Sequence, residues 1–345
     1  MKKLLNTLYV NQPDVYLSLD GENIVFLGVN NVEVNPRRPL HLFEGIVSFG
    51  YRGVSPALMG KCVEMGISLS FCKPSGRFLA EVSGEVRGNV LLRRKHYRIA
   101  DDVEQSLSLA KVITAAKITN SRWVLERATR DHALQVDGEK ITRAITSLKK
   151  AKDDALKSLT HEELMGIEGK AASSYFWAFD ELILHSKEHF YFKERTKRPP
   201  MDNVNALLSF VYSLLTKEIA SALIAVGLDP FVGFIHKERP GRHSLALDLI
   251  EELRAPVADR FVLTLINTRR VNAKGFTQKE NGAVMMDENT RKTFLTAWQE
   301  HKKEQLTHPY LKEKISWGLV PHAQAQLLAS YLRGDLDGYP PFLWK

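Results

Sequence analysis

Cysteine is nearly absent from this sequence, and so are the long apolar runs of membrane proteins. The 345 residues include two cysteines, Cys62 and Cys72, each in apolar sequence and without metal-type spacing. We therefore expect buried free thiols, not a disulfide framework or a structural zinc site. No stretch approaches the roughly 18 apolar residues of a spanning helix, and residues 1–6 lack the apolar core of a secretory signal. These absences predict a cytoplasmic protein without a membrane association.

The motifs of nucleotide-binding and serine-nucleophile enzymes are also absent. No Walker loop or dinucleotide fingerprint occurs, and no serine has a Gly-x-Ser-x-Gly context. With 44% hydrophobic and 26% charged residues, the composition is that of a soluble globular protein. A net charge of +8 favours a polyanionic partner.

The character of the sequence changes near residue 90. Before it, short extended runs alternate with turns, as at Asp20-Gly21, a hairpin signal. Beyond it, residues 104–131 and 140–158 contain no glycine or proline, as expected of long helices. The length favours two domains. We predict an α+β protein with a small β-rich domain over residues 1–90 and a larger all-helical catalytic domain over residues 91–345.

Two local patterns refine this organisation. Thr160 to Glu163 has the pattern of a capping box that opens a helix. The segment 272–289 is polar and contains two glycines, which predicts an exposed loop.

Residues 233–254 hold the densest group of potential metal ligands. His236 precedes a Pro-Gly loop, and the helix that follows carries Asp248, Glu251 and Glu252 on one flank. Glu168 is a further acid, set among small residues. His236 alone is also explained as a packed histidine, and the three acids of the helix as a solvated face. Glu168 is less easily explained in this way, because its stretch should lie near the core, where an unpaired carboxylate is costly. Together, one imidazole and several carboxylates suit Mn²⁺ or Mg²⁺ better than structural zinc.

Basic residues cluster in three places. Arg93–Arg98 and Lys193–Arg198 mix cations with aromatic or hydroxyl side chains, as phosphate-binding surfaces do, although solvated turns explain them equally. Lys237, Arg239, Arg242 and Arg254 surround the proposed metal site. Cations beside carboxylates and a metal are what phosphodiester chemistry needs to hold an anionic substrate.

Taken in order, these motifs resemble the Cas1 family of CRISPR-associated adaptation integrases. The segments that carry the resemblance are Gly88–Arg94, Lys117–Asn120, Leu125–Arg127, Gly166–Gly169, Arg198–Pro200, Asn205–Ser209 with Tyr212, Gly227–His236 and Ser244–Arg254. The ending Asp337–Phe342 resembles the type I-C branch. His96 departs from the pattern, because relatives often have glutamine there.

The resemblance implies a metal-dependent DNA endonuclease and integrase that inserts spacer DNA into CRISPR arrays by transesterification. It implies Glu168, His236 and Glu251 as metal ligands, with Asp248 as a supporting acid. The implied partners are double-stranded DNA, a second copy of the chain joined through the β-rich domain, the Cas2 protein and the Cas4 protein.

We further predict DNA contacts for seven residues, Arg93, Arg94, Lys197, Arg198, Tyr212, Arg239 and Arg242. Two other functions stay open at this point. One is a non-catalytic DNA-binding scaffold, and the other is a metal-dependent hydrolase of small phosphate esters.

Overall fold

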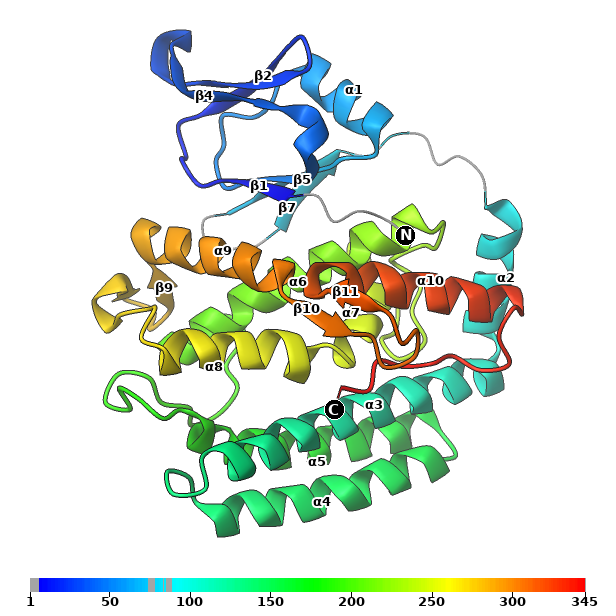
Figure 1. The fold of residues 1–345 in the computed structure, drawn as a ribbon. Helices are drawn as coiled ribbons and strands as arrows, with labels where there is room; N and C mark the ends of the chain where they lie inside the picture. Colours follow the sequence, from blue (N-terminus) through cyan, green and yellow to red (C-terminus); the bar gives the residue numbers. More distant parts are fainter. Residues whose placement is uncertain (1–5, 74–77, 83, 85–88, 345) are drawn as a thin grey trace. The chain divides into compact units, whose positions relative to one another are not determined.

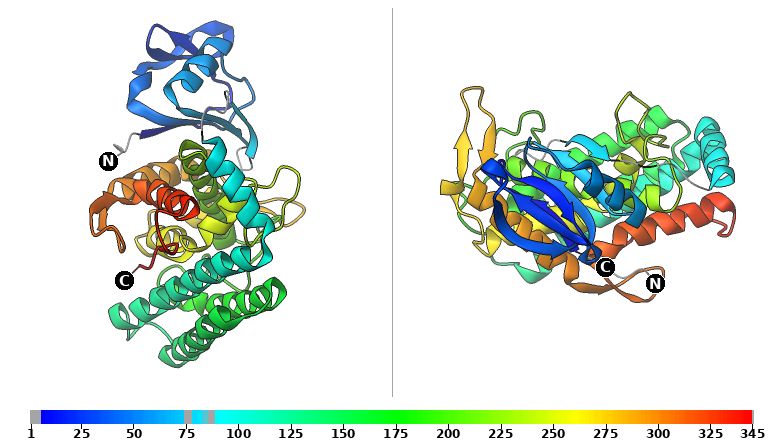
Figure 2. Two further views of the ribbon diagram at one scale, coloured as in Figure 1. Left: turned by 90° about the vertical axis from the view of Figure 1, so that its right-hand side faces the viewer. Right: turned by 90° about the horizontal axis from the view of Figure 1, so that it is seen from above.

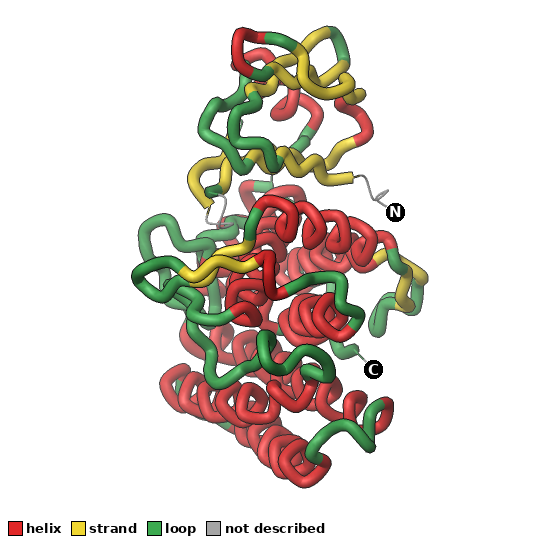
Figure 3. The backbone as a smooth tube through the Cα atoms, turned by 90° about the vertical axis from the view of Figure 1, so that its left-hand side faces the viewer, coloured by secondary structure: helices red, strands yellow, loops and turns green. Residues whose placement is uncertain are grey.

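The computed structural model describes residues 6–73, 78–82, 84 and 89–344. They form two compact units, one within Met1–Gly88 together with Glu288–Lys303 and one from Asn89–Asp287 with Glu304–Lys345 (Figure 1). The first unit is β-rich and the second mainly helical (Figure 3), which confirms the predicted α+β class. Gly88 and residues 1–5, which entered the sequence predictions, lie outside the described residues.

The N-terminal unit is built from two sheets around one core. Strands β2 (Tyr16–Asp20), β3 (Asn23–Leu27) and β4 (Glu33–Pro39) are antiparallel. The second sheet has the order β1 (Asn6–Val10), β5 (Phe43–Ser48), β6 (Ser68–Cys72), β7 (Phe78–Val82). Helix α1 (Pro56–Met65) makes the crossover that parallel β5 and β6 require. Asp20 pairs with Asn23, so the predicted hairpin is present.

Helix α9 (Glu288–Lys303) returns the chain to this first unit. Gln299 Nε2 donates to the Thr7 carbonyl at 2.9 Å, and Lys302 Nζ donates to Thr7 Oγ1 at 3.1 Å. A single boundary near residue 90 therefore does not describe the division of the chain, because α9 packs on strand β1.

The second unit is a helical assembly with three long neighbouring helices. Its helices are α2 (Val90–Asp101), α3 (Val103–Asp131), α4 (Gly138–Lys157), α5 (His161–Phe179), α6 (Asn203–Ala225), α7 (Ser244–Glu251), α8 (Arg260–Asn267) and α10 (Val320–Arg333). Helices α3, α4 and α5 run side by side (Figures 1 and 2). Thr160 Oγ1 accepts the Glu163 N–H and the Glu163 carboxylate accepts the Leu159 N–H. The capping box thus fixes the start of α5, the helix that carries Glu168.

Two short hairpins interrupt the helical unit. They are β8 (Phe276–Gln278) with β9 (Val284–Met286), and β10 (Gln305–Thr307) with β11 (Lys314–Ser316). The prediction of an irregular loop over 272–289 was wrong in this respect. Three-residue strands leave too short an alternating pattern to be recognised from sequence.

Helix α6 is the core helix of the unit. By length and composition it could cross a membrane. Its apolar side chains at Val204, Leu207, Leu208 and Val211 are buried inside the protein. The helical periodicity in this stretch therefore marks packing on several neighbours.

The C-terminal segment packs between α3 and α7. Asn120 on α3 donates to the carbonyls of Glu252 and Phe342, both at 2.7 Å, and accepts the Trp344 N–H at 3.0 Å. The Glu252 carboxylate accepts from Tyr339 Oη at 2.6 Å and from the Phe342 N–H at 2.9 Å. These bonds anchor the end of α7, where Glu251 lies.

Candidate active site

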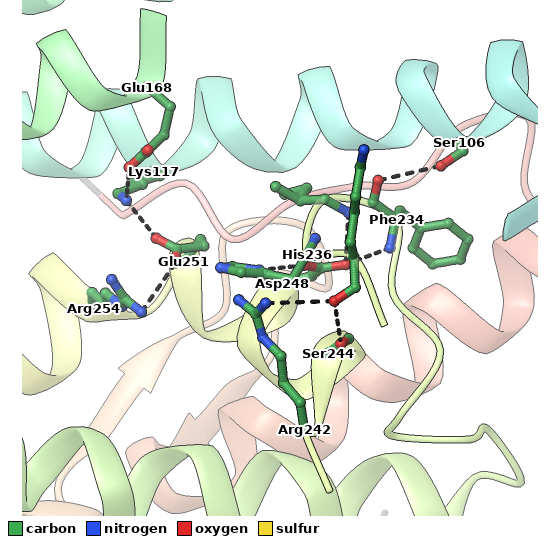
Figure 4. A network of polar contacts seen from close by, with 12 residues as sticks. Ser106, Lys117, Glu168, Phe234, His236, Arg242, Ser244, Asp248, Glu251 and Arg254 are labelled. Carbon is green, nitrogen blue, oxygen red and sulfur yellow. Dashed lines mark hydrogen bonds and ion pairs between the residues drawn. The ribbon is translucent and has the colours of Figure 1, made fainter. Parts of the chain in front are cut away.

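Three of the predicted site residues come from three separate segments of the helical unit. Glu168 lies on α5, Glu251 is the last residue of α7, and His236 lies in the loop before α7. Lys117 on α3 joins the two acids, because its Nζ forms an ion pair with Glu168 Oε1 and lies 2.6 Å from Glu251 Oε2 (Figure 4). The fold therefore brings Glu168 and Glu251 within reach of one cation.

Glu251 is a buried carboxylate held in its charged form. Arg254 Nη2 lies 3.1 Å from its Oε1 atom. Burial raises the pKa of Glu251, but the positive charges of Arg254 and Lys117 outweigh burial and lower that pKa to about 2. The charge of His236 acts in the same direction, so the imidazole is within electrostatic reach. Glu251 is thus ionised at neutral pH.

Asp248 orients His236. The Asp248 side chain is fully buried, and its Oδ1 atom lies 2.7 Å from His236 Nδ1 and accepts the His236 N–H at 3.0 Å. Its Oδ2 atom accepts the N–H groups of Phe234 at 2.5 Å and Ile235 at 3.0 Å. A ring nitrogen engaged by a carboxylate leaves the other nitrogen, Nε2, as the free electron-pair donor. Asp248 is therefore a supporting acid in geometry as well as in sequence.

Gly233 is required by this close packing. A Cβ atom there would lie 2.8 Å from Asp248 Oδ2 and 3.0 Å from the Ser244 backbone. Any side chain would push the loop off α7 and move His236 with it.

The donor set fits a divalent cation such as Mn²⁺ or Mg²⁺. It combines one imidazole nitrogen with two carboxylates, and hard cations of this kind take oxygen ligands with an occasional imidazole. Glu251 Oε2 is buried and has Lys117 Nζ at 2.6 Å as its charged neighbour. Within the described part of the chain, no three His, Cys, Asp or Glu side chains lie close enough together as they stand to hold a metal ion. The ammonium of Lys117 lies between two of the acids.

Glu252, the other acid on this flank, faces away from the site. Burial raises its pKa to about 7, and its partners are the neutral donors Tyr339, Gln324 and Phe342 N–H. It holds the C-terminal segment and is not placed to bind a metal with Glu168.

Tyr212, a predicted DNA contact, lies inside a charged cluster. Its hydroxyl donates to Asp259 Oδ1 at 2.5 Å, and Tyr175 donates to Oδ2 at 3.0 Å. The guanidinium groups of Arg195 and Arg254 lie 5.2 and 5.1 Å from the centre of the Tyr212 ring. The Tyr212 ring therefore stabilises the positive charge of Arg254 by a cation–π contact, and Arg254 in turn forms an ion pair with Glu251.

The other predicted DNA contacts fall into two groups. Arg94 is exposed and Arg93 half-buried on α2, and Arg198 is exposed after the Lys193 run. Lys197 is also exposed, but desolvation and the charges of Arg254 and Arg195 lower its pKa. Lys197 is therefore within electrostatic reach of Arg254 and Glu251, although 54 residues of sequence separate it from Glu251.

Arg239 and Arg242 belong to the loop that carries His236. The Arg242 N–H donates to the Arg239 carbonyl at 2.9 Å, and Arg239 is exposed. Sequence reasoning missed Lys117, Arg195 and Asp259 as members of this site. Lys117 stood within a recognised motif, but nothing local assigned it a role.

His96 anchors the same loop from α2. Its side chain is fully buried, its Nε2 atom lies 3.0 Å from the Val232 carbonyl, and its ring packs on Phe234. Burial lowers the pKa of His96, and the hydrogen bond to Val232 only partly offsets this.

Comparison with known proteins gives matches along the whole chain. Residues 8–300 match the family profile described as CRISPR associated protein Cas1. The chain is 48% identical over 345 residues to "CRISPR-associated endonuclease Cas1 1" of Chlorobaculum tepidum, covering all of both proteins. It is 47% identical over 353 residues to "CRISPR-associated endonuclease Cas1 2" of Rhodospirillum rubrum, again covering both. A Cas4 exonuclease/Cas1 endonuclease fusion of Geobacter sulfurreducens is 34% identical over 98% of this chain and 60% of the fusion.

Solved structures show the same fold. A CAS1 protein from Thermotoga maritima has a TM-score of 0.81 at 23% identity, covering 99% of this chain and all of that one. A casposase bound to its integration product also scores 0.81 at 23% identity, covering 97% and 92%. A chain of a Cas6-RT-Cas1–Cas2 complex scores 0.81 at 19% identity, covering all of this chain and 36% of that one.

We predict that His96 makes the protein sensitive to mild acid. Its pKa is lower in the folded chain than in the unfolded one, so as pH falls through about 6.5 the unfolded chain binds the proton first and the free energy of unfolding decreases. His96→Gln should lose this dependence. Urea unfolding at pH 7.5 and 5.5 measures the free energy of unfolding. Between these pH values, that free energy should fall by up to about 1.4 kcal/mol per pH unit more in the wild type than in the variant. Parallel profiles would contradict the assignment.

Proposed function

The chain belongs to the Cas1 family, and from that premise we propose that it is a metal-dependent DNA endonuclease that inserts spacer DNA into CRISPR arrays. The relatives that match over its whole length carry the name of CRISPR-associated endonuclease. The observation that carries the proposal is the convergence of Glu168 and Glu251 on one cation, with the Asp248-oriented His236 within electrostatic reach of Glu251. Cations around such a cluster suit a phosphodiester substrate.

Glu168, Glu251 and His236 Nε2 would hold the cation, which we propose to be Mn²⁺ or Mg²⁺. When bound, it would supply a positive charge that polarises the scissile phosphate. Asp248 keeps the imidazole in the right tautomer and orientation, and Arg254 keeps Glu251 ionised. A DNA 3′-hydroxyl that attacks phosphorus displaces the strand oxygen and joins two DNAs, whereas water in that place cuts the strand.

The surrounding cations would position the DNA. Arg239 and Arg242 lie in the loop that carries His236, and Lys197 is within electrostatic reach of Glu251. We propose that these three cations bind the reacting strand. Arg93, Arg94 and Arg198 would hold phosphates farther along the duplex.

The proposed protein partners are Cas2 and Cas4. Cas4 is fused to Cas1 in the Geobacter sulfurreducens relative, and Cas2 accompanies Cas1 in the solved complex. Membership of the type I-C branch is supported by the ending Asp337–Phe342. We also propose a cytoplasmic protein without a membrane association, supported by the burial of α6 in the core.

We propose a homodimer formed through the N-terminal unit. Strands β2 and β4 form the edges of one sheet, and Val29 and Val32 just before β4 and Val34 within it expose 66, 62 and 47% of their surface. Exposed sheet edges with apolar side chains need a cover.

The metal ligands are tested by substitution. Asp248→Asn removes a residue that orients a ligand and should reduce strand transfer by roughly 10–100-fold. A larger reduction is expected from each substitution of a ligand itself, Glu168→Gln, His236→Ala or Glu251→Gln. The assay uses Mn²⁺, the Cas2 partner and supercoiled DNA with a CRISPR repeat. Glu162→Gln, an exposed acid on α5, is the matched control. Full transfer by Glu251→Gln, or DNA binding with no metal-dependent transfer by the wild type, would contradict the proposal.

The two groups of cations should differ in their effects. Arg93→Ala with Arg94→Ala should lower the slope of log affinity against log salt by about 0.9 for each lost phosphate contact, with an unchanged rate at saturating DNA. Lys197→Ala or Arg239→Ala should instead lower the saturated rate. Salt titrations and single-turnover transfer measure both, with Lys150→Ala on α4 as the control. Equal effects from both groups would show that the division is wrong.

The dimer is tested by sedimentation. The wild type at micromolar concentration should have twice the mass of the chain, and Val34→Arg should shift it toward the monomer by placing a charge in the interface. A monomeric wild type would refute this assembly.

A further inference from the structure

Lys117 takes the place of a shared cation between two of the proposed ligands. Its Nζ atom contacts Glu168, on α5, and Glu251, on α7, while Lys117 itself lies on α3 (Figure 4). Only 13% of the Lys117 side chain is exposed, against 31% for Glu168 and 7% for Glu251. One ammonium group thus lies against two carboxylates and reduces the repulsion between them.

The ammonium and a divalent cation cannot both lie between these carboxylates. Metal–oxygen distances for Mg²⁺ are about 2.0–2.1 Å, so an ion bound to both acids would occupy the space now taken by Nζ. Two positive centres so close together in a buried site repel strongly. Binding of the metal to both acids therefore requires Lys117 to withdraw from at least one of them.

A withdrawn Lys117 needs a new anion. A buried charge without a partner is strongly unfavourable, and two other acids of this region are already committed, Asp248 to His236 and Asp259 to Tyr212 and Tyr175. The anion that the proposed function brings to this site is the phosphodiester. Its arrival would offer the ammonium a partner beside the ligands.

We propose that Lys117 is a positioning residue that makes metal binding and DNA binding depend on each other. It competes with the divalent cation for Glu168 and Glu251 when no DNA is present, and it transfers to a DNA phosphate when the complex forms. This inference rests on the proposed function. It assigns to Lys117 a regulatory role at the same site.

The inference is tested by Mn²⁺ affinity, measured by calorimetry with and without a short DNA duplex whose 3′ ends are dideoxy, so that no transfer occurs. In the wild type the duplex should tighten Mn²⁺ binding by a factor in the range of about 5–150 that is typical of linked sites. Lys117→Met should bind Mn²⁺ more tightly than the wild type without DNA, and the duplex should add little. Lys117→Arg should restore the wild-type pattern because it keeps the charge.

Two controls separate structure from competition. Lys111→Met, on the same helix, should behave as the wild type. If Lys117→Met does not fold, Lys117→Gln provides the neutral variant with a polar end. Equal Mn²⁺ affinity in the wild type and the neutral variants, or weaker binding by those variants, would overturn the inference while leaving the metal site intact. Absence of Mn²⁺ binding to every protein, the wild type included, would overturn the proposed function as well.

Discussion

The neutralisation of one buried carboxylate, Glu251, is the constraint on which the site depends. A carboxylate removed from water is tolerated only with charged or hydrogen-bonding partners. Here the partners are Lys117 from α3 and Arg254 from the π-helical turn Arg254–Asp259 after α7, and Arg254 packs on Tyr212 of α6. Three helices and a turn are therefore tied to one charge, and their relative positions cannot change without exposing or unpairing it.

Two adjacent glutamates show that the surroundings of a carboxylate set its pKa. Glu251 and Glu252 are both buried, yet the pKa of Glu251 falls to about 2 while that of Glu252 rises to about 7. Glu251 faces two cations, whereas Glu252 faces the neutral donors of the C-terminal segment. The short helix α7 is thus held from both sides, by charges toward the site and by hydrogen bonds toward the tail.

The sequence predicted the features that local patterns encode. The long helices without glycine or proline, the Asp-Gly turn and the capping box at Thr160 each depend on local sequence, and each is present in the structure. Ligand chemistry likewise singled out Glu168 and Glu251, which both contact Lys117 in the structure, whereas their role as metal ligands with His236 stays a prediction. The pairing of Lys117 with Glu168 and Glu251, and the return of α9 to the first unit, join residues far apart in the chain. Such contacts follow from tertiary packing, which no window of sequence contains.

Charge balance connects this arrangement to the proposed chemistry. Glu168 and Glu251 contribute two negative charges, and Lys117 and Arg254 contribute two positive charges, so these four side chains balance one another. A divalent cation added to them would bring two further positive charges into a partly buried place, which the carboxylate of Asp248 balances only in part. An anionic phosphodiester reduces that excess, while a neutral ligand does not. The same cations that make a buried carboxylate tolerable therefore make the site selective for an anionic substrate once a metal is bound.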